Sequence, residues 1–382
     1  MTSDTRPRTD FDPLDQLNRF DDFPRYDDIR AAGGIAWSDA HGGFWAVAGH
    51  DLVKDIASDD RRFGSGAGVR IPPNGTPATF ALEYDRPRHT AHRRILTDAV
   101  GPRATPNLDA QVRAHARRLL DTSTDGRLDL GADYAFHLSL DVVFDLIGAP
   151  HELKAEAETL AEALFLYRTP MPDGSDPAVR LQQILDEMIA SRVENPRDDW
   201  LTQVAVHPCL STTEAQGAIV ALLVGGHHST ARATACLLAR VVSEPDLQAR
   251  LRAEPERIPD AVEETVRLHT PLRWFARTAL EDVEVGGTPV RAGERLLLLY
   301  AGANRDPQRF PGADVFDLDR PRSRDHLAFG WGIHRCVGMP LAQLEIRVAL
   351  EELFARTTDL TLTGEVTWTS STEPRHIPTR LA

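Results

Sequence analysis

A cysteine in a glycine-rich string is the residue of this chain best placed to do chemistry. Residues 329–338 read Phe-Gly-Trp-Gly-Ile-His-Arg-Cys-Val-Gly, with three glycines around Cys336. Glycines permit tight turns and close approach of a bulky ligand to the backbone. Cys336 precedes a predicted helix, whose free N–H groups and positive dipole end stabilise a thiolate. Such a thiolate is a nucleophile or a metal ligand, although a zinc site would need further Cys or His residues nearby. A buried structural cysteine is an equally open alternative.

The same string resembles the haem-binding signature of the cytochrome P-450 family, F-G-x-G-x-H-x-C-x-G, at every fixed position. The resemblance covers residues 20–382 in the order of its motifs and is to the bacterial soluble class. It implies that Cys336 is the axial thiolate ligand of the iron of haem b and that Phe329 contacts the haem. As a nucleophile, Cys336 would instead make the chain a cysteine hydrolase, but only His334 is then near enough in sequence to act as a base.

A second match is an E-x-x-R sequence on a helix predicted over residues 259–269. Glu264 and Arg267 lie three residues apart, on one helix face. Read alone, they would form an ordinary exposed ion pair. In the family this pair is buried and binds an arginine ahead of the cysteine loop, for which Arg320 is the candidate here.

Four further side chains match the family's ligands for the two haem propionates. His89 and Arg93 lie four residues apart on one helix, as in the family's H-x-x-x-R pair, while Arg277 and His334 match two more. Arginines and other strong donors neutralise partly buried carboxylates. Read singly, each of these residues would more often lie on the surface. The histidines and cysteines without such context are predicted to be structural or solvated: His115, His137, His207, His269, His376, Cys209 and Cys236.

The central helix departs from the family's A/G-G-x-D/E-T motif, because this chain reads Gly225-Gly226-His227-His228-Ser229-Thr230. Each mid-helix glycine costs roughly 1 kcal/mol relative to alanine, so the pair is predicted to open a groove for O2. His228 takes the place of the acid and Ser229 that of the threonine, with Thr230 as a substitute if the helix unwinds locally. A neutral imidazole can shuttle protons near pH 7. Three hypotheses stay open: a His–Ser proton relay, substrate-assisted proton delivery, and unusual chemistry such as peroxide use.

The elements that position these residues are mostly helical. Apolar residues at three- and four-residue spacing predict helices over residues 88–100, 108–122, 135–147, 153–167 and 178–193. A capping box at Ser211 begins a helix that ends near Ser243, and further helices are predicted over 50–59, 259–269 and 337–355. β-Prone segments predict hairpins over 34–47, 283–290 and 361–369 and a strand over 294–300. The fold class is therefore α+β and mostly helical, which agrees with a P-450 fold with a long central helix and a small β-rich part. Residues 1–20 are predicted to be a flexible N-terminus and residues 21–382 a single domain.

Composition narrows the class of protein. The 382 residues are 42% hydrophobic and 26% charged, with a net charge of −14. These values exclude a disordered chain and argue against binding to nucleic acid or to an anionic membrane. The N-terminus does not resemble a signal peptide, and no apolar run of about 18 residues predicts a membrane span. Three scattered cysteines predict a reducing compartment, so a cytoplasmic location is expected.

The resemblance implies a haem-thiolate monooxygenase that inserts one oxygen atom of O2 into a small organic substrate. No G-x-G-x-x-G follows a strand, so electrons are expected from a ferredoxin and a ferredoxin reductase. Arginines near the cysteine loop are candidates for docking that partner: Arg94, Arg103, Arg113, Arg117, Arg335 and Arg347. The alternatives are a haem-thiolate peroxygenase, another non-hydroxylating haem enzyme, and a non-catalytic haem sensor.

Three segments correspond to the family's substrate-contact regions, namely residues 61–80, 165–180 and 272–275. Trp274 and Phe275 suit an apolar or aromatic group. Arg70, Arg168 and Arg273 could meet a substrate carboxylate, or they could simply face solvent.

Overall fold

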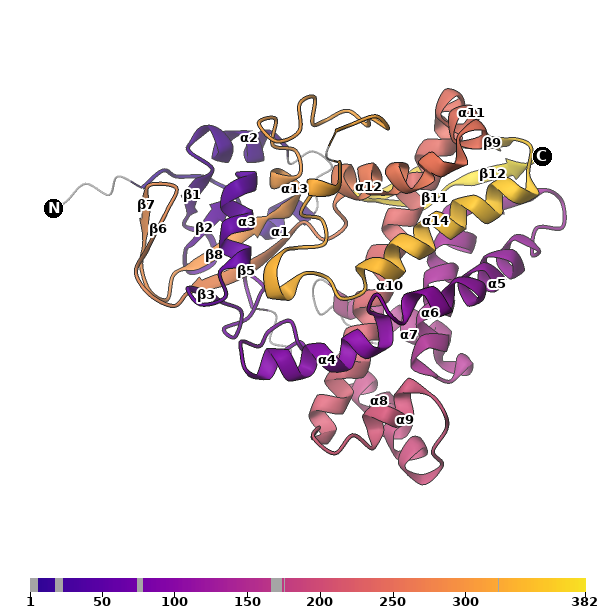
Figure 1. Ribbon diagram of the computed structural model, residues 1–382, viewed down its shortest axis with the longest axis horizontal. Helices are drawn as coiled ribbons and strands as arrows, with labels where there is room; N and C mark the ends of the chain where they lie inside the picture. Colours follow the sequence, from indigo (N-terminus) through magenta and orange to yellow (C-terminus); the bar gives the residue numbers. More distant parts are fainter. Residues whose placement is uncertain (1–5, 18–22, 74–77, 166–173, 175, 322) are drawn as a thin grey trace.

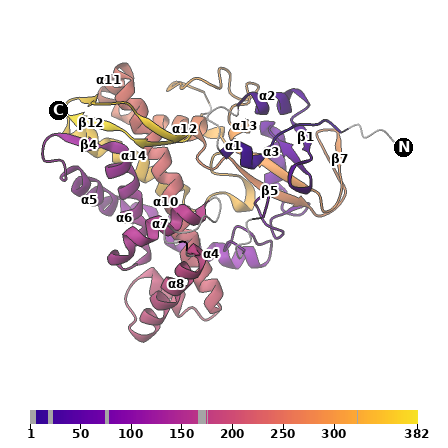
Figure 2. The same ribbon diagram turned by 180° about the vertical axis from the view of Figure 1, so that it is seen from behind.

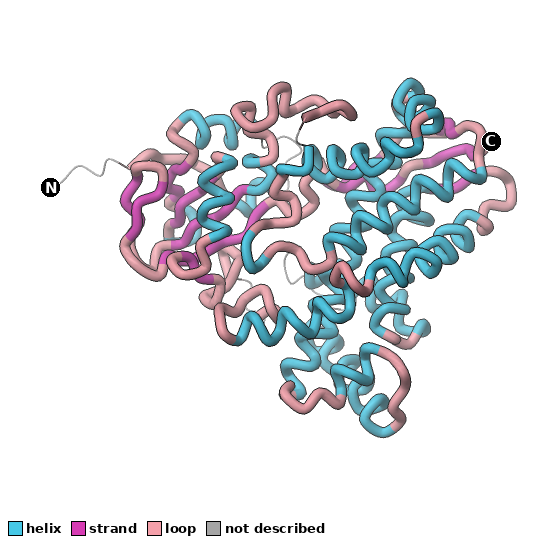
Figure 3. The backbone as a smooth tube through the Cα atoms, in the orientation of Figure 1, coloured by secondary structure: helices cyan, strands magenta, loops and turns pink. Residues whose placement is uncertain are grey.

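The computed structural model describes residues 6–17, 23–73, 78–165, 174, 176–321 and 323–382. Helices build the larger part of the molecule, and a mixed sheet builds the smaller part on the side of the N-terminus (Figures 1 and 3). The helices on the N-terminal side of the central one are α1 (Pro13–Leu17), α2 (Phe23–Ala31), α3 (His50–Ser58), α4 (Arg88–Val100), α5 (Asp109–Leu120), α6 (Phe136–Ile147), α7 (Lys154–Phe165), α8 (Pro177–Glu194) and α9 (Trp200–Ala205). After the central helix come α11 (Pro245–Ala253), α12 (Ile258–His269), α13 (Tyr300–Ala303) and α14 (Met339–Arg356). The mostly helical α+β prediction is confirmed.

The long central helix α10 spans Thr212–Ser243 and passes through the helical part of the molecule (Figure 1). It begins with the predicted capping box: the N–H of Glu214 donates to Ser211 Oγ at 3.2 Å, and the N–H of Ser211 donates to the Glu214 carboxylate at 2.9 Å. In its apolar middle Ala218, Ile219, Leu222 and Leu223 are buried, because α6, α12 and α14 pack against the helix. An all-round apolar helix needs such cover on several sides.

The main sheet holds five strands in the order β1 (Ile35–Ser38), β2 (Phe44–Val47), β8 (Arg295–Leu299), β5 (Trp274–Ala279) and β3 (Phe63–Gly64). β2 and β8 run parallel, and the other pairs are antiparallel. The predicted hairpins over 34–47 and 283–290 are confirmed as β1–β2 and as β6 (Val283–Val285) with β7 (Thr288–Val290).

The hairpin predicted over residues 361–369 is wrong. β9 (Leu360–Leu362) pairs with β12 (Pro378–Leu381), which also pairs with β4 (Arg127–Asp129). β10 (Thr367–Ser370) pairs instead with β11 (Glu373–His376). The turn residues around Gly364 are compatible with a hairpin, but β9 pairs with the C-terminal strand β12 instead. β12 joins β9 to the distant strand β4, which lies beside β12 in Figure 2.

The N-terminal segment predicted to be flexible packs against the fold over the part that the structure describes. Phe11 is 0% exposed, and Arg8 forms an isolated bridge with Trp37 of β1. Residues 1–5 and 18–22 lie outside the described residues, so the domain boundary stays a prediction. No helix in the described ranges is long and apolar enough to cross a membrane.

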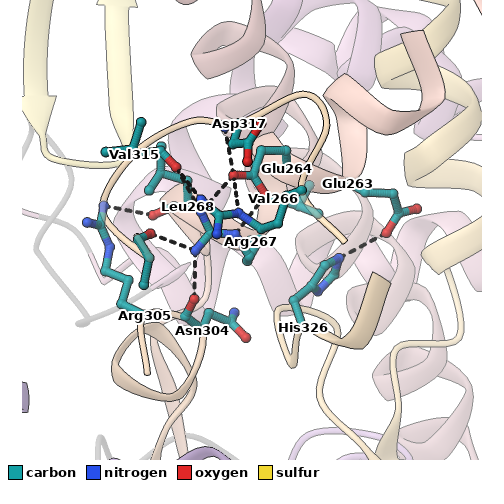
Figure 4. A network of polar contacts seen from close by, with 12 residues as sticks. Glu263, Glu264, Val266, Arg267, Leu268, Asn304, Arg305, Val315, Asp317 and His326 are labelled. Atoms are coloured by element: carbon teal, nitrogen blue, oxygen red, sulfur yellow. Dashed lines mark hydrogen bonds and ion pairs between the residues drawn. The ribbon is translucent and has the colours of Figure 1, made fainter. Parts of the chain in front are cut away.

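A buried ionic network joins α12 to the irregular segment between α13 and α14 (Figure 4). Arg267 donates from Nε and Nη2 to the two Glu264 oxygens at 2.7 and 2.8 Å, and Arg320 Nε donates to Glu264 at 2.8 Å. The three side chains are 0–3% exposed. The predicted partner Arg320 is confirmed, and the reading of Glu264 and Arg267 as an exposed pair is excluded.

The same guanidinium groups also bind carbonyl oxygens of the irregular segment. Arg267 Nη1 donates to the carbonyls of Asn304 and Ala313, each at 2.8 Å, and the Arg320 guanidinium donates to those of Pro311, Gly312 and Val315. Burial by itself would raise the pKa of Glu264, but the hydrogen bonds and charges of Arg267 and Arg320 lower it overall. Glu264 is therefore ionised, and its charge is shared between two buried cations.

Replacing Arg267 by alanine should leave the buried Glu264 carboxylate with Arg320 as its remaining ion-pair partner. Breaking a buried pair in this way costs about 3–5 kcal/mol, which is a large part of an ordinary stability margin. Chemical unfolding followed by circular dichroism measures the loss. Arg250→Ala breaks an exposed ion pair to Asp319 instead and serves as the control, with little change expected. An Arg267→Ala protein as stable as this control would contradict the structural role of the network.

Candidate functional site

A cavity of about 880 Å³ lies where α10 meets the cysteine loop, the end of β5 and the β10–β11 hairpin. Nine of the residues that the sequence marks as functional line it: Arg93, Gly225, Gly226, Ser229, Thr230, Arg277, Phe329, His334 and Cys336. The structure therefore brings together residues from four separate parts of the chain: α4, α10, β5 and the cysteine loop. His89 and His228 are not among the lining residues.

The cysteine loop is shaped by its glycines and by the start of α14. Gly330 and Gly332 have φ values of +64° and +70°, which favour glycine over other residues. Gly332 also lies against α3, so that an added Cβ atom would be 2.0 Å from the carbonyl oxygen of Ala57. The N–H of Cys336 donates to the carbonyl of Phe329 at 2.7 Å, which closes the loop just ahead of α14.

Cys336 faces the cavity from the N-terminal end of α14. Its side chain is accessible from the cavity, and protein surrounds the thiol on its other sides. Burial raises the pKa of the Cys336 thiol, while the N–H groups of Gly338 and Met339 and the charges of Arg93 and Arg335 act to lower it. The loop thus presents one sulfur with donors already aimed at it, as a thiolate ligand requires.

Four basic side chains gather at one end of the cavity around the loop. The rings of His89 and His334 meet edge to face, with centroids 4.5 Å apart. Burial, together with the nearby charges of Arg277, His89 and Arg93, lowers the pKa of His334 to about 2. Burial and Arg93 likewise lower the pKa of His89, whose Nδ1 is buried without a hydrogen-bond partner among the described residues. Mutual repulsion of this kind marks a place where an anionic group would be stabilised, so these residues fit a cofactor with buried carboxylates.

The two glycines of α10 have different neighbours. A Cβ atom at Gly225 would meet nothing within 4 Å, so this position leaves open space beside the cavity. A Cβ atom at Gly226 would lie 2.8 Å from Val143 Cγ2, so this glycine allows α6 to cross α10 closely. The predicted groove therefore rests on Gly225. Ser229 Oγ donates to the Gly225 carbonyl at 3.3 Å, and Thr230 also lines the cavity without any unwinding of the helix.

The two histidines of α10 are buried and are not among the residues that line the cavity. His228 is 4% exposed, and burial together with the charges of Arg232 and Arg375 lowers its pKa to about 3. His227 is 0% exposed and its ring centroid lies 6.2 Å from that of Phe136. Both imidazoles are therefore neutral near pH 7. The structure places Ser229, but not His228, on the cavity wall.

Sequence reasoning missed several polar residues of the cavity wall. Arg232 on α10 forms an ion pair with Glu373 of β11 at 2.6 Å, and Arg375 of β11 lies 4.3 Å from the ring centroid of Phe136. Glu345 of α14 is also a lining residue. No local pattern in the sequence marked these four residues, because α14 and β11 reach α10 only in the tertiary fold.

The segments predicted to contact substrate reach the cavity through part of their length. From the first segment, residues 69–71 and 78–80 line the cavity. All of residues 272–275, including Trp274 and Phe275, line it too, and from the segment 165–180 Ala178 is a lining residue. Arg70 lies 3.6 Å from Glu83, and Arg273 donates a hydrogen bond to Ser371. Arg168 lies outside the described residues.

The histidines and cysteines predicted to be passive lie outside the cavity lining. His115 and His376 bind Asp145 and Asp129 at 2.6 and 2.9 Å. The other three histidines are each held locally: His137 contacts the Asp133 carbonyl, His207 accepts the Cys209 N–H, and His269 stacks on Trp368. Cys236 is buried, with its sulfur 3.4 Å from the Thr372 carbonyl, and burial raises its thiol pKa. Cys209 is exposed.

Replacing Gly332 by alanine should disturb the cysteine loop more than the same change at Gly330. Both residues have positive φ, so both variants carry backbone strain of the order of 1–3 kcal/mol. Gly332→Ala also places its Cβ atom against the Ala57 carbonyl oxygen, a backbone atom that cannot rotate away as a flexible side chain can. A Cβ atom at Gly330 would be 3.7 Å from its nearest neighbour. We expect a clearly lower melting temperature for Gly332→Ala than for Gly330→Ala. Equal melting temperatures would show that the loop does not depend on the contact between Gly332 and α3.

Comparison with known proteins gives one consistent family. Residues 184–356 match the family model described as Cytochrome P450. The chain is 34% identical over 331 residues to Cytochrome P450-SU2 of Streptomyces griseolus, which covers 83% of this chain and 81% of the relative. It is 31% identical to Cytochrome P450 monooxygenase PikC of Streptomyces venezuelae, over 96% of this chain and 92% of that one. A solved structure of HinD with NMFT and NO superimposes with a TM-score of 0.87 at 30% identity, covering 96% of this chain and 98% of that chain.

Proposed function

Since the chain belongs to the cytochrome P-450 family of haem-thiolate monooxygenases, we propose that it inserts one oxygen atom of O2 into a small organic substrate held in the cavity, with Cys336 as the iron ligand. The observation that carries this proposal is the position of the Cys336 thiol. It lies at the start of α14, faces a cavity of about 880 Å³, and has the N–H groups of Gly338 and Met339 aimed at it. When bound, haem supplies the redox chemistry that activates O2 with electrons and protons delivered from outside.

We assign the haem propionates to His89, Arg93, Arg277 and His334. These side chains converge on one end of the cavity, and burial together with nearby positive charges lowers the pKa values of both histidines. Two carboxylates there would neutralise those charges. Phe329, Gly225 and Gly226 complete the proposed contacts with the macrocycle, since all three line the same cavity.

The alcohols of Ser229 and Thr230 are proposed to bind water or O2 beside α10. Both line the cavity next to the open position at Gly225. His228 remains the residue at the family's acid position, but its pKa of about 3 makes it a neutral imidazole at pH 7. A neutral imidazole can pass a proton on only if it receives one at its other nitrogen. The His–Ser relay therefore needs a proton source elsewhere.

The substrate is proposed to be largely apolar. Aliphatic and aromatic side chains make up much of the wall, Leu181, Val220, Trp274 and Phe275 among them, beside polar residues such as Gln216. Arg70 and Arg273 already bind Glu83 and Ser371, so they are weaker candidates for a carboxylate clamp. Spin-state shifts on adding aromatic acids, fatty acids and macrolides distinguish these substrate classes. A shift confined to acids would contradict an apolar-only mode of recognition.

Electrons are proposed to come from a ferredoxin and its reductase, docking beside the cysteine loop. Lys54 and Arg335 flank Trp331 there, at 4.4 and 5.1 Å from its ring centroid. Arg94 of α4 and Arg103, just after the end of α4, are both exposed. The other three candidates carry less net charge because acids bind them: Arg113 and Arg347 share Asp109 and Glu351, and Arg117 binds Glu352. The three free cysteines agree with a reducing compartment such as the cytoplasm.

Replacing Arg335 by glutamate should slow reduction by an acidic ferredoxin, because it reverses the charge beside the loop. Loss of a docking charge acts mainly on the association rate and its salt dependence. Stopped-flow reduction at low and high salt measures the effect. Arg291→Glu, the same change at an exposed site on the turn between β7 and β8, is the control. Equal reduction rates for both variants at low salt would place the docking surface elsewhere.

The alternative functions differ in simple measurements. A peroxygenase would work far better with hydrogen peroxide than with O2 and a ferredoxin, and a sensor would bind haem without turnover. A cysteine hydrolase would need a base beside Cys336, but the pKa of about 2 makes His334 a poor one.

Replacing Cys336 by alanine should remove the thiolate signature while leaving the fold. The wild-type protein should be red, and its reduced carbon-monoxide complex should show the long-wavelength band of thiolate ligation. The variant should lose that band and its oxygenase turnover. Cys236→Ala, at a buried cysteine outside the cavity lining, is the control and should keep the band. A Cys336→Ala protein with the wild-type spectrum would place the axial ligand elsewhere, and a colourless wild-type protein would overturn the proposed function.

A further inference from the structure

Arginines outnumber acids on the cavity wall. Among the described lining residues the arginines are Arg70, Arg88, Arg93, Arg232, Arg273, Arg277 and Arg375, and the acids are Glu214, Glu345 and Glu373. Arg93 and Arg277 belong to the proposed propionate site, and Arg70 and Arg88 pair with nearby glutamates. The other three arginines lie at the β10–β11 hairpin, away from the residues assigned to the cofactor.

The β10–β11 hairpin gathers these three arginines from separate parts of the chain. Arg232 of α10 reaches Glu373 of β11 at 2.6 Å, and β11 packs against α10. Arg273, just before β5, donates a hydrogen bond to Ser371 in the turn of the hairpin. Arg375 stands two residues after Glu373 on the same strand, so the two side chains share one face of β11, and both line the cavity.

The charges at the hairpin do not balance within the described cavity lining. Glu373 faces the three arginines as a carboxylate. Glu214 is in the first turn of α10, about 27 Å along the helix axis from Arg232 at 1.5 Å per residue. Burial raises the pKa of Glu345 well above its usual value, so this group adds no negative charge. The end of the cavity at the hairpin therefore carries an excess of positive charge.

The histidines next to the hairpin respond to this excess. Burial, together with the charges of Arg232 and Arg375, lowers the pKa of His228 to about 3, and the same two arginines act on His227. Burial also lowers the pKa of Arg232, and the charge of Arg273 contributes to that shift. Cations that are partly removed from water and repel one another are stabilised by an anion placed among them.

The donors at the hairpin suit a carboxylate in particular. A guanidinium group carries five N–H donors in a planar fork that matches the two oxygens of a carboxylate, so an arginine that already makes one contact keeps donors for a ligand. Thr369, Ser370 and Thr372 of the hairpin add hydroxyl groups to the same wall. Leu181 and Val220 line other parts of the cavity. A ligand that satisfies both kinds of wall has an apolar body and one carboxylate.

We propose that Arg375 and Arg232, with the charge of Arg273 beside them, form an anion subsite that binds the carboxylate of an otherwise apolar substrate. The inference rests on the proposed function and deepens it, because it adds one acid group to the largely apolar substrate. Glu373 positions Arg232 in this subsite and competes with the substrate carboxylate for it.

Isothermal titration calorimetry of the haem-loaded protein measures the preference for a charged group. The probes are two pairs that differ at one end of the molecule: octanoic acid with octanamide, and phenylacetic acid with phenylacetamide. Hydrogen bonds to a charged group are stronger than those to a neutral one, so we expect the acid of at least one pair to bind about 10-fold or more tightly than its amide. Equal binding, tighter binding of the amides, or no binding of either acid would overturn the subsite.

Two substitutions should move the acid affinity in opposite directions. Arg375→Gln removes a cation, so we expect the affinity for the acid to fall about 10-fold while that for the amide stays within about twofold. Glu373→Gln removes the competing carboxylate but keeps an acceptor for Arg232, so the affinity for the acid should rise about 5-fold. Disturbed packing would weaken both probes in both variants. Shifts of the same sign in the two variants would therefore contradict the proposal.

Two further arginine variants locate the effect. Arg380→Gln is the control, because Arg380 is an exposed residue of β12 outside the cavity lining. Its ratio of acid to amide affinity should stay within about twofold of wild type. Arg70→Gln removes the arginine that lies beside Glu83 on another part of the wall. If Arg70→Gln abolished the acid preference and Arg375→Gln kept it, the subsite would be overturned.

A conservative variant keeps the test decisive if Arg375→Gln does not fold. Arg375→Lys retains the charge but loses the planar fork, so it should lose part of the acid preference. An unchanged ratio of acid to amide affinity in both Arg375→Lys and Glu373→Gln would contradict the proposal.

The outcomes separate the subsite from the function on which it rests. Calorimetry needs no turnover, so the acid preference is measured whether or not the protein oxygenates a substrate. A reduced carbon-monoxide complex without the thiolate band would overturn the monooxygenase proposal. A normal thiolate band together with equal binding of acids and amides would overturn the subsite alone.

Discussion

Burying the charge of Glu264 imposes a constraint that reaches far beyond α12. The carboxylate has to be neutralised inside the protein, and Arg267 and Arg320 do this from two different segments. Their remaining N–H groups must also be satisfied, and the carbonyl oxygens of residues 304–315 accept them. A stretch of chain with little helix or strand of its own is thereby held in one conformation (Figure 4).

That constraint extends to the cysteine loop through neighbouring groups. Asn304, whose carbonyl binds Arg267, accepts the N–H of Leu327 at 2.6 Å through its side chain. Glu263, next to Glu264 in sequence, binds His326 at 3.0 Å, and His326 in turn accepts the N–H of Ala328. The residues just ahead of the loop are thus tied to α12 at several points. With Gly332 against α3 and α14 beginning at Met339, the position of the Cys336 sulfur is determined from both sides.

Charged and titratable side chains lie in different regions of the cavity wall. The end near the loop collects His89, Arg93, Arg277 and His334, which suits an anionic cofactor. The wall near α10 and β11 holds the Arg232–Glu373 pair, beside two histidines kept neutral by burial and by nearby arginines. Glu345 of α14 contacts Ser139 of α6, and burial raises its pKa well above the usual value. Burial sets the protonation state at each place more strongly than residue type does, since a histidine at an acid's position and a glutamate in an apolar wall both end up neutral.

The sequence alone determined the helical periodicity, the capping box at Ser211, the glycine-rich cysteine loop and the E-x-x-R pair, because these are local patterns or fixed spacings in one segment. Tertiary structure alone decided which strand β9 joins, since the competing partner β12 is the C-terminal strand. It also decided that Ser229 lines the cavity while His228 does not, because the packing of α6 and β11 against α10 sets which helix face is covered. The protonation of Glu345 was beyond the reach of the sequence for the same reason: its pKa depends on desolvation and on Ser139, a residue over 200 positions away that only the folded chain brings into contact.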